Sequence, residues 1–191
     1  RNIALWILLM TFASTILYFM QAHLVGEAIT DRALRRAFLA RVDLAVNSVT
    51  IITQALLTAR ILRCIGVGAT LAVLPAVAAL GFITLGSTST SIALSALLIV
   101  RVLYDSSRHA LAKPAREVLF TRLSREQRYK SKAFIDAAVY RGGDLLSGWI
   151  YAGLAAAGMT AGAIALSAAL VAVLWALLGR RLGWGDRGTD R

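Results

Sequence analysis

The chain has 191 residues, of which 58% are hydrophobic and 16% are charged. Soluble globular domains average roughly 45–50% apolar and about 25% charged residues, so this composition excludes an ordinary soluble domain. The single cysteine excludes an internal disulfide and a cysteine-based metal cluster, and the formal net charge of +11 raises the question of a nucleic-acid partner.

Six apolar segments of membrane-spanning length follow one another along the chain, because a bilayer core about 30 Å thick needs ~20 apolar residues per helix. We predict helices at residues 2–21, 38–62, 67–85, from about 91 to a break before Pro114, 131–157 and 161–178. Together with short links they fill the sequence. We therefore expect an all-α integral membrane protein, with one six-helix bundle over residues 1–182 and a cytoplasmic tail over 183–191.

Polar side chains follow one face of four of these segments, whereas segments 67–85 and 161–178 contain no charged residue. The polar positions recur every three or four residues, which places them on one side of each helix. They are Thr11, Ser14, Tyr18 and Gln21 on the first segment, Asp43, Asn47, Thr50, Gln54 and Thr58 on the second, Arg101, Asp105 and Arg108 on the fourth, and Lys132, Asp136, Tyr140, Asp144, Ser147 and Tyr151 on the fifth.

The order polar, polar, apolar therefore occurs twice, in units of about 1–87 and 88–182. Because three is an odd number of membrane spans, the second unit would lie in the membrane in the opposite orientation to the first. Two such units form the inverted repeat found within one half of a major facilitator transporter. The chain begins with Arg1 rather than Met and shows no signal-peptide pattern. We therefore interpret it as the C-terminal half of a longer protein, with an N-terminal six-helix half as its partner.

Basic residues gather on one side of the predicted bundle. They follow the second, fourth and sixth segments, whereas the loops at 86–90 and 158–162 carry no charge. The positive-inside rule explains this placement without a nucleic-acid partner and puts both ends in the cytoplasm, as expected for the cell inner membrane. The basic link 26–41 lies on the opposite side, and we interpret it as an amphipathic extension of the second helix.

Charged side chains inside the predicted helices need a partner or a cavity, because each costs about 2.5–3.5 kcal/mol or more at membrane depth. One interpretation pairs them, Arg101 with Asp105 and Arg141 with Asp144 or Asp43, as structural locks or as gates between transport conformations. A second makes Arg101 and Arg141 anion-binding residues, because guanidinium groups bind phosphate and carboxylate in two-point geometry.

A third interpretation makes Asp136, Asp144 or Asp43 a proton carrier, because a carboxylate that loses its water holds a proton more readily. The tyrosines also allow two interpretations. Tyr18, Tyr140 and Tyr151 could stack on a base or an aromatic substrate, or pack with their hydroxyls bonded to a neighbouring helix.

Catalytic and metal-binding motifs are absent from the sequence. It contains no nucleophile elbow, no His-Glu-x-x-His motif and no Gly-x-x-x-x-Gly-Lys-Ser/Thr phosphate loop. A membrane-embedded enzyme acting on lipid-linked phosphates would show clustered acidic motifs at adjacent helix ends, and a receptor or anchor would not need polar stripes on four helices. We therefore expect neither an enzyme nor a bound cofactor or metal.

Three stretches carry a family resemblance. Residues 113–120 read Lys-Pro-Ala-Arg-Glu-Val-Leu-Phe, residues 129–136 read Tyr-Lys-Ser-Lys-Ala-Phe-Ile-Asp, and residues 141–143 read Arg-Gly-Gly. They resemble the ATP/ADP translocase (nucleotide transporter) family, which has a Pro followed two residues on by a basic residue and Glu. That family then has Lys-x-Lys-Ala-x-Ile/Val-Asp, with a Gly seven residues beyond the Asp. Residues 38–58 are similar to the free-living bacterial branch.

This resemblance implies a major facilitator fold of twelve helices, of which this chain would supply helices seven to twelve. It implies nucleotide exchange, with Lys132 and Arg141 as the basic residues that face the cavity. The nucleotide exchangers have Lys after the Gly, whereas this chain has Asp144. An anion there favours a less charged or cationic substrate, or proton coupling.

The sequence thus predicts a secondary active transporter that works by alternating access. Nucleotide exchange is implied by the resemblance, and transport of another small solute, with or without proton coupling, is the alternative. The expected partners are a small-molecule solute, the lipid bilayer and the N-terminal half. The candidate residues are Arg101, Lys132, Arg141, Tyr140 and Asn47 for substrate binding, and Asp43, Asp105, Asp136 and Asp144 for gating or coupling.

Overall fold

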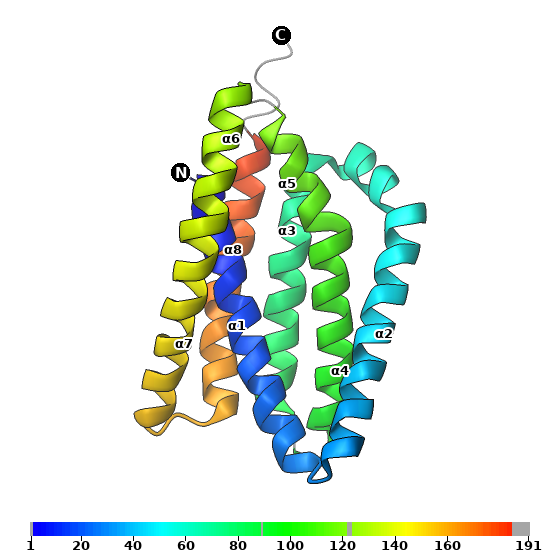
Figure 1. Ribbon diagram of the computed structural model, residues 1–191, viewed down its shortest axis with the longest axis vertical. Coiled ribbons are helices and arrows are strands. Elements are labelled where there is room, and N and C mark those ends of the chain that lie inside the picture. Colours follow the sequence, from blue (N-terminus) through cyan, green and yellow to red (C-terminus); the bar gives the residue numbers. More distant parts are fainter. Residues whose placement is uncertain (1, 89, 122–123, 185–191) are drawn as a thin grey trace.

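The computed structural model describes residues 2–88, 90–121 and 124–184, which form helices and short turns without a β-strand. The elements are α1 (Asn2–Ala28), α2 (Arg32–Leu56), α3 (Thr58–Ser87), α4 (Thr90–Ser107), the π-helical turn η1 (Arg108–Ala112), α5 (Lys113–Phe120), α6 (Arg125–Phe134), the π-helical turn η2 (Ile135–Tyr140), α7 (Arg141–Ala156) and α8 (Ala161–Trp184). The long helices lie side by side along the long axis, and α1, α2 and α3 run opposite to α4, α7 and α8 respectively (Figure 1).

The two uncharged segments, α3 and α8, pack against each other along much of their length. Glycines allow this close approach, because a Cβ at Gly162 would lie 3.2 Å from the Gly86 carbonyl oxygen and one at Gly179 would lie 3.2 Å from that of Leu71. Small residues let membrane helices approach until their backbones touch, which increases dispersion contact. The α3–α8 pair therefore forms the spine of the bundle.

The remaining helices pack around this spine in pairs. Helix α1 lies against α7 and α8, whereas α4 lies against α2 and α3. Between them is a core of fully buried side chains that includes Ile16, Leu74, Phe82 and Leu97. Trp6 of α1 and Trp175 of α8 close this core at one end, with ring centroids 5.3 Å apart.

Three of the described helices are long and apolar enough to cross a membrane. They span Asn2–Ala28, Thr58–Ser87 and Ala161–Leu182, with mean hydropathies of 2.1, 2.0 and 2.4. Large apolar side chains on two of them point outward: Leu80 is 66% exposed and Leu170 is 71% exposed. Such an apolar outer surface fits association with lipid.

The basic link at residues 26–41 is mostly helical. Asp31 begins α2 earlier than the predicted start at residue 38, because its carboxylate accepts hydrogen bonds from the backbone N–H of Ala33 and Leu34 at 2.7 and 2.8 Å. The interpretation of this link as an extension of the second helix is confirmed. Arg35 has a structural role there, because its guanidinium donates to the Ile29 carbonyl at 2.8 Å at the end of α1.

The break predicted before Pro114 is wrong, because α4, η1 and α5 continue one another. Where the π-helical turn η1 returns to α-helical hydrogen bonding, one backbone carbonyl is left without an N–H donor. Pro114 has no backbone N–H, so a second carbonyl also lacks its donor. The carbonyls of His109 and Ala110 instead accept from Gln54 Nε2 at 3.1 Å and Thr58 Oγ1 at 2.8 Å. Side chains from the α2–α3 junction thus satisfy the backbone that Pro114 leaves open.

The predicted starts at residues 2, 91 and 161 and the predicted end at residue 157 are matched to within one residue, whereas some other boundaries differ. Gly66, with φ of 76°, divides α3 into two helical segments. The second begins at residue 67, as predicted, and the first extends back to Thr58. The fifth predicted helix starts earlier, at Arg125, where Ser124 and Gln127 form a capping box, and it continues through η2 into α7. The tail predicted over residues 183–191 lies outside the described residues from 185 onward.

Replacing Thr58 by valine should destabilise the fold. The substitution keeps the side-chain volume but leaves the buried Ala110 carbonyl without a donor, so the free energy of unfolding should fall by about 1–3 kcal/mol. Denaturant unfolding in detergent micelles, followed by circular dichroism, measures this change. Thr84→Val is the matched control, because the exposed Thr84 hydroxyl bonds only the Leu80 carbonyl of its own helix. Equal losses in both variants would contradict the role given to Thr58.

Candidate functional site

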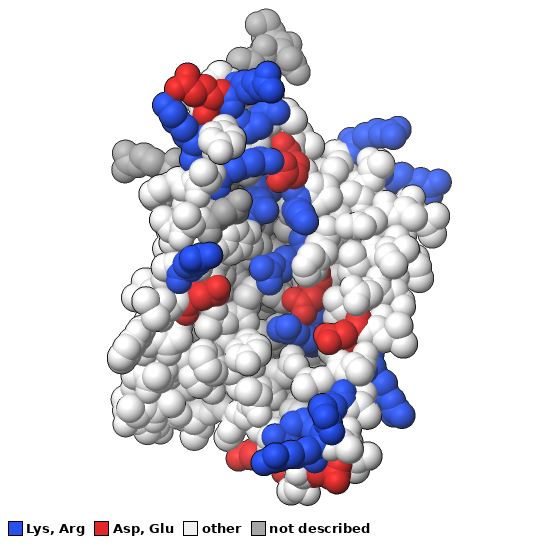
Figure 2. Space-filling model, in the orientation of Figure 1, with Lys and Arg blue, Asp and Glu red and all other residues white. Residues whose placement is uncertain are grey.

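A polar cavity lies between α1, the α4–η1 segment and the η2–α7 segment. We call it the central cavity; it has a volume of about 420 Å³. Its wall includes Thr15 and Tyr18 from α1, Arg101 and Arg108 from the α4 side, and Asp144 from α7. Figure 2 shows acidic and basic side chains gathered along this hollowed face, whereas most of the surrounding surface is uncharged.

Arg101 and Asp105 form an ion pair one helical turn apart on α4, with Arg101 Nε 2.8 Å from Asp105 Oδ2. The Asp105 side chain is only 10% exposed, whereas that of Arg101 is 23% exposed and lines the cavity. This pairing was predicted from the sequence and is confirmed. Arg101 is therefore the more accessible partner from the cavity.

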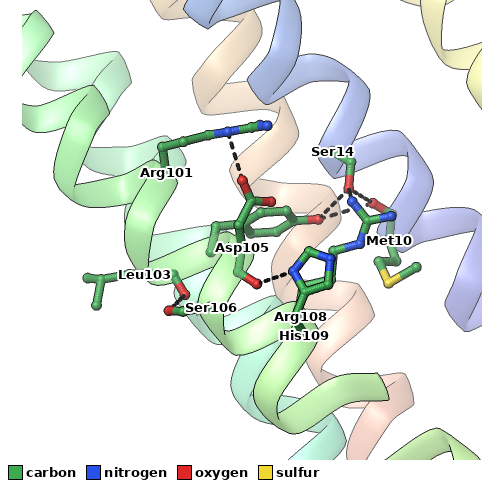
Figure 3. A network of polar contacts seen from close by, with 9 residues as sticks. Met10, Ser14, Arg101, Leu103, Asp105, Ser106, Arg108 and His109 are labelled. Atoms are coloured by element: carbon green, nitrogen blue, oxygen red, sulfur yellow. Dashed lines mark hydrogen bonds and ion pairs between the residues drawn. The ribbon is translucent and has the colours of Figure 1, made fainter. Parts of the chain in front are cut away.

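Tyr104 and Ser14 join α4 to α1 beside this ion pair. Figure 3 shows Ser14 of α1 facing the segment that carries Arg101 and Asp105. The buried Tyr104 hydroxyl lies 2.9 Å from Ser14 Oγ and donates to the Met10 carbonyl at 3.1 Å. Arg108 Nη1 donates to the same Ser14 Oγ at 3.3 Å. The imidazole Nδ1 of His109 lies 2.7 Å from the Asp105 carbonyl oxygen. This network fixes the wall of the cavity and holds Arg108 toward it.

Tyr104 was missing from the predicted site, and Arg108 was assigned only to a polar face. Helical spacing could have identified both, because residues 101, 104, 105 and 108 share one face of a helix. A tyrosine in an apolar run is usually a packing residue, so the sequence alone does not single out Tyr104.

Asp144 occupies the opposite wall of the central cavity. Its Oδ1 accepts a hydrogen bond from Thr15 Oγ1 of α1 at 3.2 Å, and the residue is exposed. Arg141, one turn earlier on α7, is exposed and lies outside the central cavity. Within the described part of the chain, Arg141 forms no ion pair with Asp144 or Asp43, so neither pairing predicted for it is observed.

A second hollow of about 390 Å³ lies where η1, α5, α6 and η2 meet α1. We call it the basic vestibule; its wall includes Trp6, Arg108, Lys113, Arg116, Lys132 and Tyr140. Arg108 and Tyr140 also line the central cavity, so the two hollows adjoin. Figure 2 shows many of the basic side chains gathered at this end of the bundle.

Lys132 lies in this vestibule rather than in the central cavity. Its Nζ is 2.6 Å from Glu117 Oε2, and it lies 5.5 Å from the centroid of the Phe120 ring. Tyr140 accepts a hydrogen bond from Arg116 Nη1, and the guanidinium carbon lies 5.8 Å from the centroid of its ring. Tyr140 thus stands at the boundary between the two hollows.

Asp43, Asn47 and Asp136 are the remaining predicted site residues. Asp43 and Asn47 are exposed on α2, and neither lines the central cavity or the vestibule. Asp136 belongs to η2, but its side chain lies outside the described part of the structure. Among the described residues, no group of three or more His, Cys, Asp or Glu side chains is arranged to hold a metal ion.

Comparisons with known proteins found no matching family model, no similar curated protein and no similar solved structure. The assignment of function therefore depends on the geometry of the two hollows and on the residues that the sequence analysis singled out.

Tyr104→Phe tests whether the hydroxyl of Tyr104 fastens α1 to α4. The variant keeps the buried ring but removes the bond to the Met10 carbonyl, so the free energy of unfolding should fall by about 1 kcal/mol. The same unfolding measurement in micelles checks it. Tyr129→Phe is the control, because Tyr129 is 78% exposed and should tolerate the change. If the two variants unfold alike, the hydroxyl does not fasten these helices.

Proposed function

We propose that this chain is a six-helix half of a secondary transporter and that it moves an anionic solute through the membrane by alternating access. The observation that carries the proposal is the central cavity itself. In a bundle whose outer face is apolar, Arg101, Arg108 and Asp144 face one hollow. Ionisable groups at membrane depth are costly, and they normally mark the path of a solute or an ion.

The packing scheme supports an inverted repeat of two three-helix units. Helix α1 lies against α7 and α8, and α4 lies against α2 and α3. Suppose that α1 is exchanged with α4, α2 with α7 and α3 with α8. The contacts of α1 with α7 and α8 then become the contacts of α4 with α2 and α3, which are also observed. The members of each exchanged pair run in opposite directions (Figure 1). Both features are those of the inverted repeats in secondary transporters.

This scheme assigns a side of the membrane to each end of the bundle. Basic residues at the α2–α3 junction, in α5 and α6, and at the end of α8 would lie in the cytoplasm of a bacterial cell, by the positive-inside rule. The basic vestibule would then open to the cytoplasm. Arg35, on the other side, is engaged by the carbonyls that end α1. The charge of Arg35 therefore serves the end of α1, whereas Arg32, Arg36 and Arg41 on the same side are exposed.

A nucleotide is the cargo that the sequence resemblance favours, and the wall of the cavity supports an aromatic anion. Tyr18 is 59% exposed, and its ring packs edge-on against Phe19 at 5.7 Å. The Phe19 ring in turn stacks on Tyr151 at 4.7 Å. Exposed aromatic rings can stack on a base, and guanidinium groups such as Arg101 and Arg108 can hold phosphate oxygens.

Asp144 supports the second candidate function, proton-coupled transport of another small solute. Its carboxylate lies in the same cavity as Arg101 and Arg108, so it lowers the local positive charge that would attract a polyanion. A carboxylate that faces an alternately opened cavity can also carry a proton.

Uptake of labelled ATP by cells that express the full-length transporter containing this chain tests the nucleotide proposal. Unlabelled ADP outside should chase the label out. The double variant Arg101→Gln with Asp105→Asn removes the cation without leaving its partner unpaired, and it should lower uptake about tenfold or more, the usual cost of losing a charged hydrogen-bond donor. Arg63→Gln is the control, because Arg63 is exposed and lines neither hollow.

Uptake that persists in the double variant would remove Arg101 from the transport site. Absence of ATP uptake, with the protein shown to be inserted in the membrane, would turn the proposal toward other solutes. In that case uptake driven by a pH gradient, lost in Asp144→Asn, would support the proton-coupled alternative.

Asp144→Lys provides a gain-of-function test. It introduces the cation that nucleotide exchangers have at this position, so the KM for ATP should fall about tenfold, equivalent to about 1.4 kcal/mol of binding. Competition between labelled and unlabelled ATP in the uptake assay measures it. Glu126→Lys makes the same charge change on an exposed side chain outside both hollows and should leave the KM unchanged. An unchanged KM in Asp144→Lys would argue against a nucleotide in this cavity.

A further inference from the structure

The basic vestibule contains more positive than negative charge. Lys132 is neutralised by Glu117 at 2.6 Å. Arg108, Lys113 and Arg116 line the same hollow, and none of them has a carboxylate partner among the described side chains. Three cations directed at one hollow repel one another unless an anion lies between them.

Two buried N–H groups of the vestibule wall have no acceptor among the described residues. Trp6 is 1% exposed and its indole Nε1 has no hydrogen-bond partner, and the same holds for the buried Nε of Arg116. An unsatisfied buried donor costs about 1–3 kcal/mol, so such donors usually have an acceptor that completes the site. Both atoms are closed to solvent, and both residues line the vestibule, so a small turn of either side chain would bring its N–H to an oxygen-rich ligand there.

Both donors are held in place by aromatic contacts. The Trp6 ring packs against Trp175, with centroids 5.3 Å apart, and the Arg116 guanidinium is bonded to the Tyr140 hydroxyl and faces its ring. Groups that are fixed before the ligand arrives lose little conformational entropy on binding. The vestibule is therefore a built site rather than a loose gathering of surface cations.

We propose that the basic vestibule is a phosphate-binding site, in which Trp6 and Arg116 donate to phosphate oxygens and Lys113 and Arg108 balance the charge. A phosphate matches this wall better than a carboxylate does. The donors come from α1, η1 and α5 on different sides of the hollow, and a carboxylate has only two oxygens to meet them. The volume of about 390 Å³ lies within the range of roughly 300–1,000 Å³ that is usual for small-molecule sites.

The vestibule adjoins the central cavity, so it could bind a solute during transport. This part of the inference rests on the proposed function. Arg108 and Tyr140 line both hollows, so a phosphate in the vestibule lies next to the central cavity. The vestibule would hold the phosphate end of a solute as it enters or leaves on the cytoplasmic side. It is thus a second anion site, separate from Arg101.

Binding of pyrophosphate to the purified protein in nanodiscs of neutral phosphatidylcholine tests the site directly. Isothermal titration calorimetry should give saturable binding, and malonate, a dicarboxylate, should compete at least about tenfold less well. Arg116→Lys keeps the charge but removes the guanidinium fork and should weaken pyrophosphate binding about tenfold. Trp6→Phe keeps the ring but removes the indole N–H and should weaken it severalfold.

Lys130→Gln is the matched control, because Lys130 is 74% exposed, pairs with Glu126 and lies outside both hollows. Its affinity for pyrophosphate should equal that of the unaltered protein. Equal affinities in Arg116→Lys and Lys130→Gln would overturn the proposal, as would equal binding of malonate. Circular dichroism melting of each variant confirms that it is folded.

The phosphate could belong to a soluble solute or to a lipid headgroup, and a second set of nanodiscs distinguishes them. If phosphatidylglycerol competes with pyrophosphate, and Arg116→Lys abolishes that competition, the site takes a lipid phosphate. If anionic lipid has no effect, the site takes the soluble phosphate. Failure of the transport proposal would look different, because uptake would then be absent while Arg116-dependent pyrophosphate binding remained. Normal uptake without pyrophosphate binding would overturn this inference alone.

Discussion

The close contact between α3 and α8 is the constraint on which the rest of the bundle depends. Both helices are apolar, and at Gly162 and Gly179 the space that a side chain would fill is taken by the facing backbone. Lipid tails are as apolar as leucine, so contact of this kind comes from dispersion and shape rather than from the hydrophobic effect. Once this spine is fixed, α1 and α4 pack on opposite flanks of it, and their polar faces meet.

Polar residues that meet inside the bundle fall into two groups. Some satisfy one another, as Asp105 does with Arg101 and the Tyr104 hydroxyl does with the Met10 carbonyl. Others have a hydrogen-bond partner and also line a hollow, as Asp144 does beside Thr15 in the central cavity and Arg116 does beside Tyr140 in the vestibule. The first group costs less than unpaired groups would, because its charges and dipoles are paired. The second group remains available for a ligand, and it separates into two neighbouring sites that share Arg108 and Tyr140.

Much of the fold could be predicted from the spacing of apolar and polar residues along the sequence. The helices follow from apolar runs and polar stripes, and the Arg101–Asp105 pair follows from a spacing of four residues. The break expected at Pro114 failed because its missing hydrogen bond is replaced from another part of the chain, by Gln54 and Thr58. Rules that use only neighbouring residues in the sequence cannot predict hydrogen bonds from a distant segment. The early start of α2 was readable from Asp31 as an N-cap, but the surrounding arginines obscured it.

By itself, the sequence determined the helical class, the positions of the apolar segments and the identity of the charges that need a partner, since hydropathy and spacing are local properties. Only the tertiary structure decided which charges meet. It placed Lys132 beside Glu117 in the vestibule, left Arg141 outside the central cavity, and brought Trp6 and Arg116 together across more than half the chain. The physical reason is that the spacing of residues along one helix fixes only the direction in which their side chains point. The neighbour that lies in that direction is set by how the helices pack.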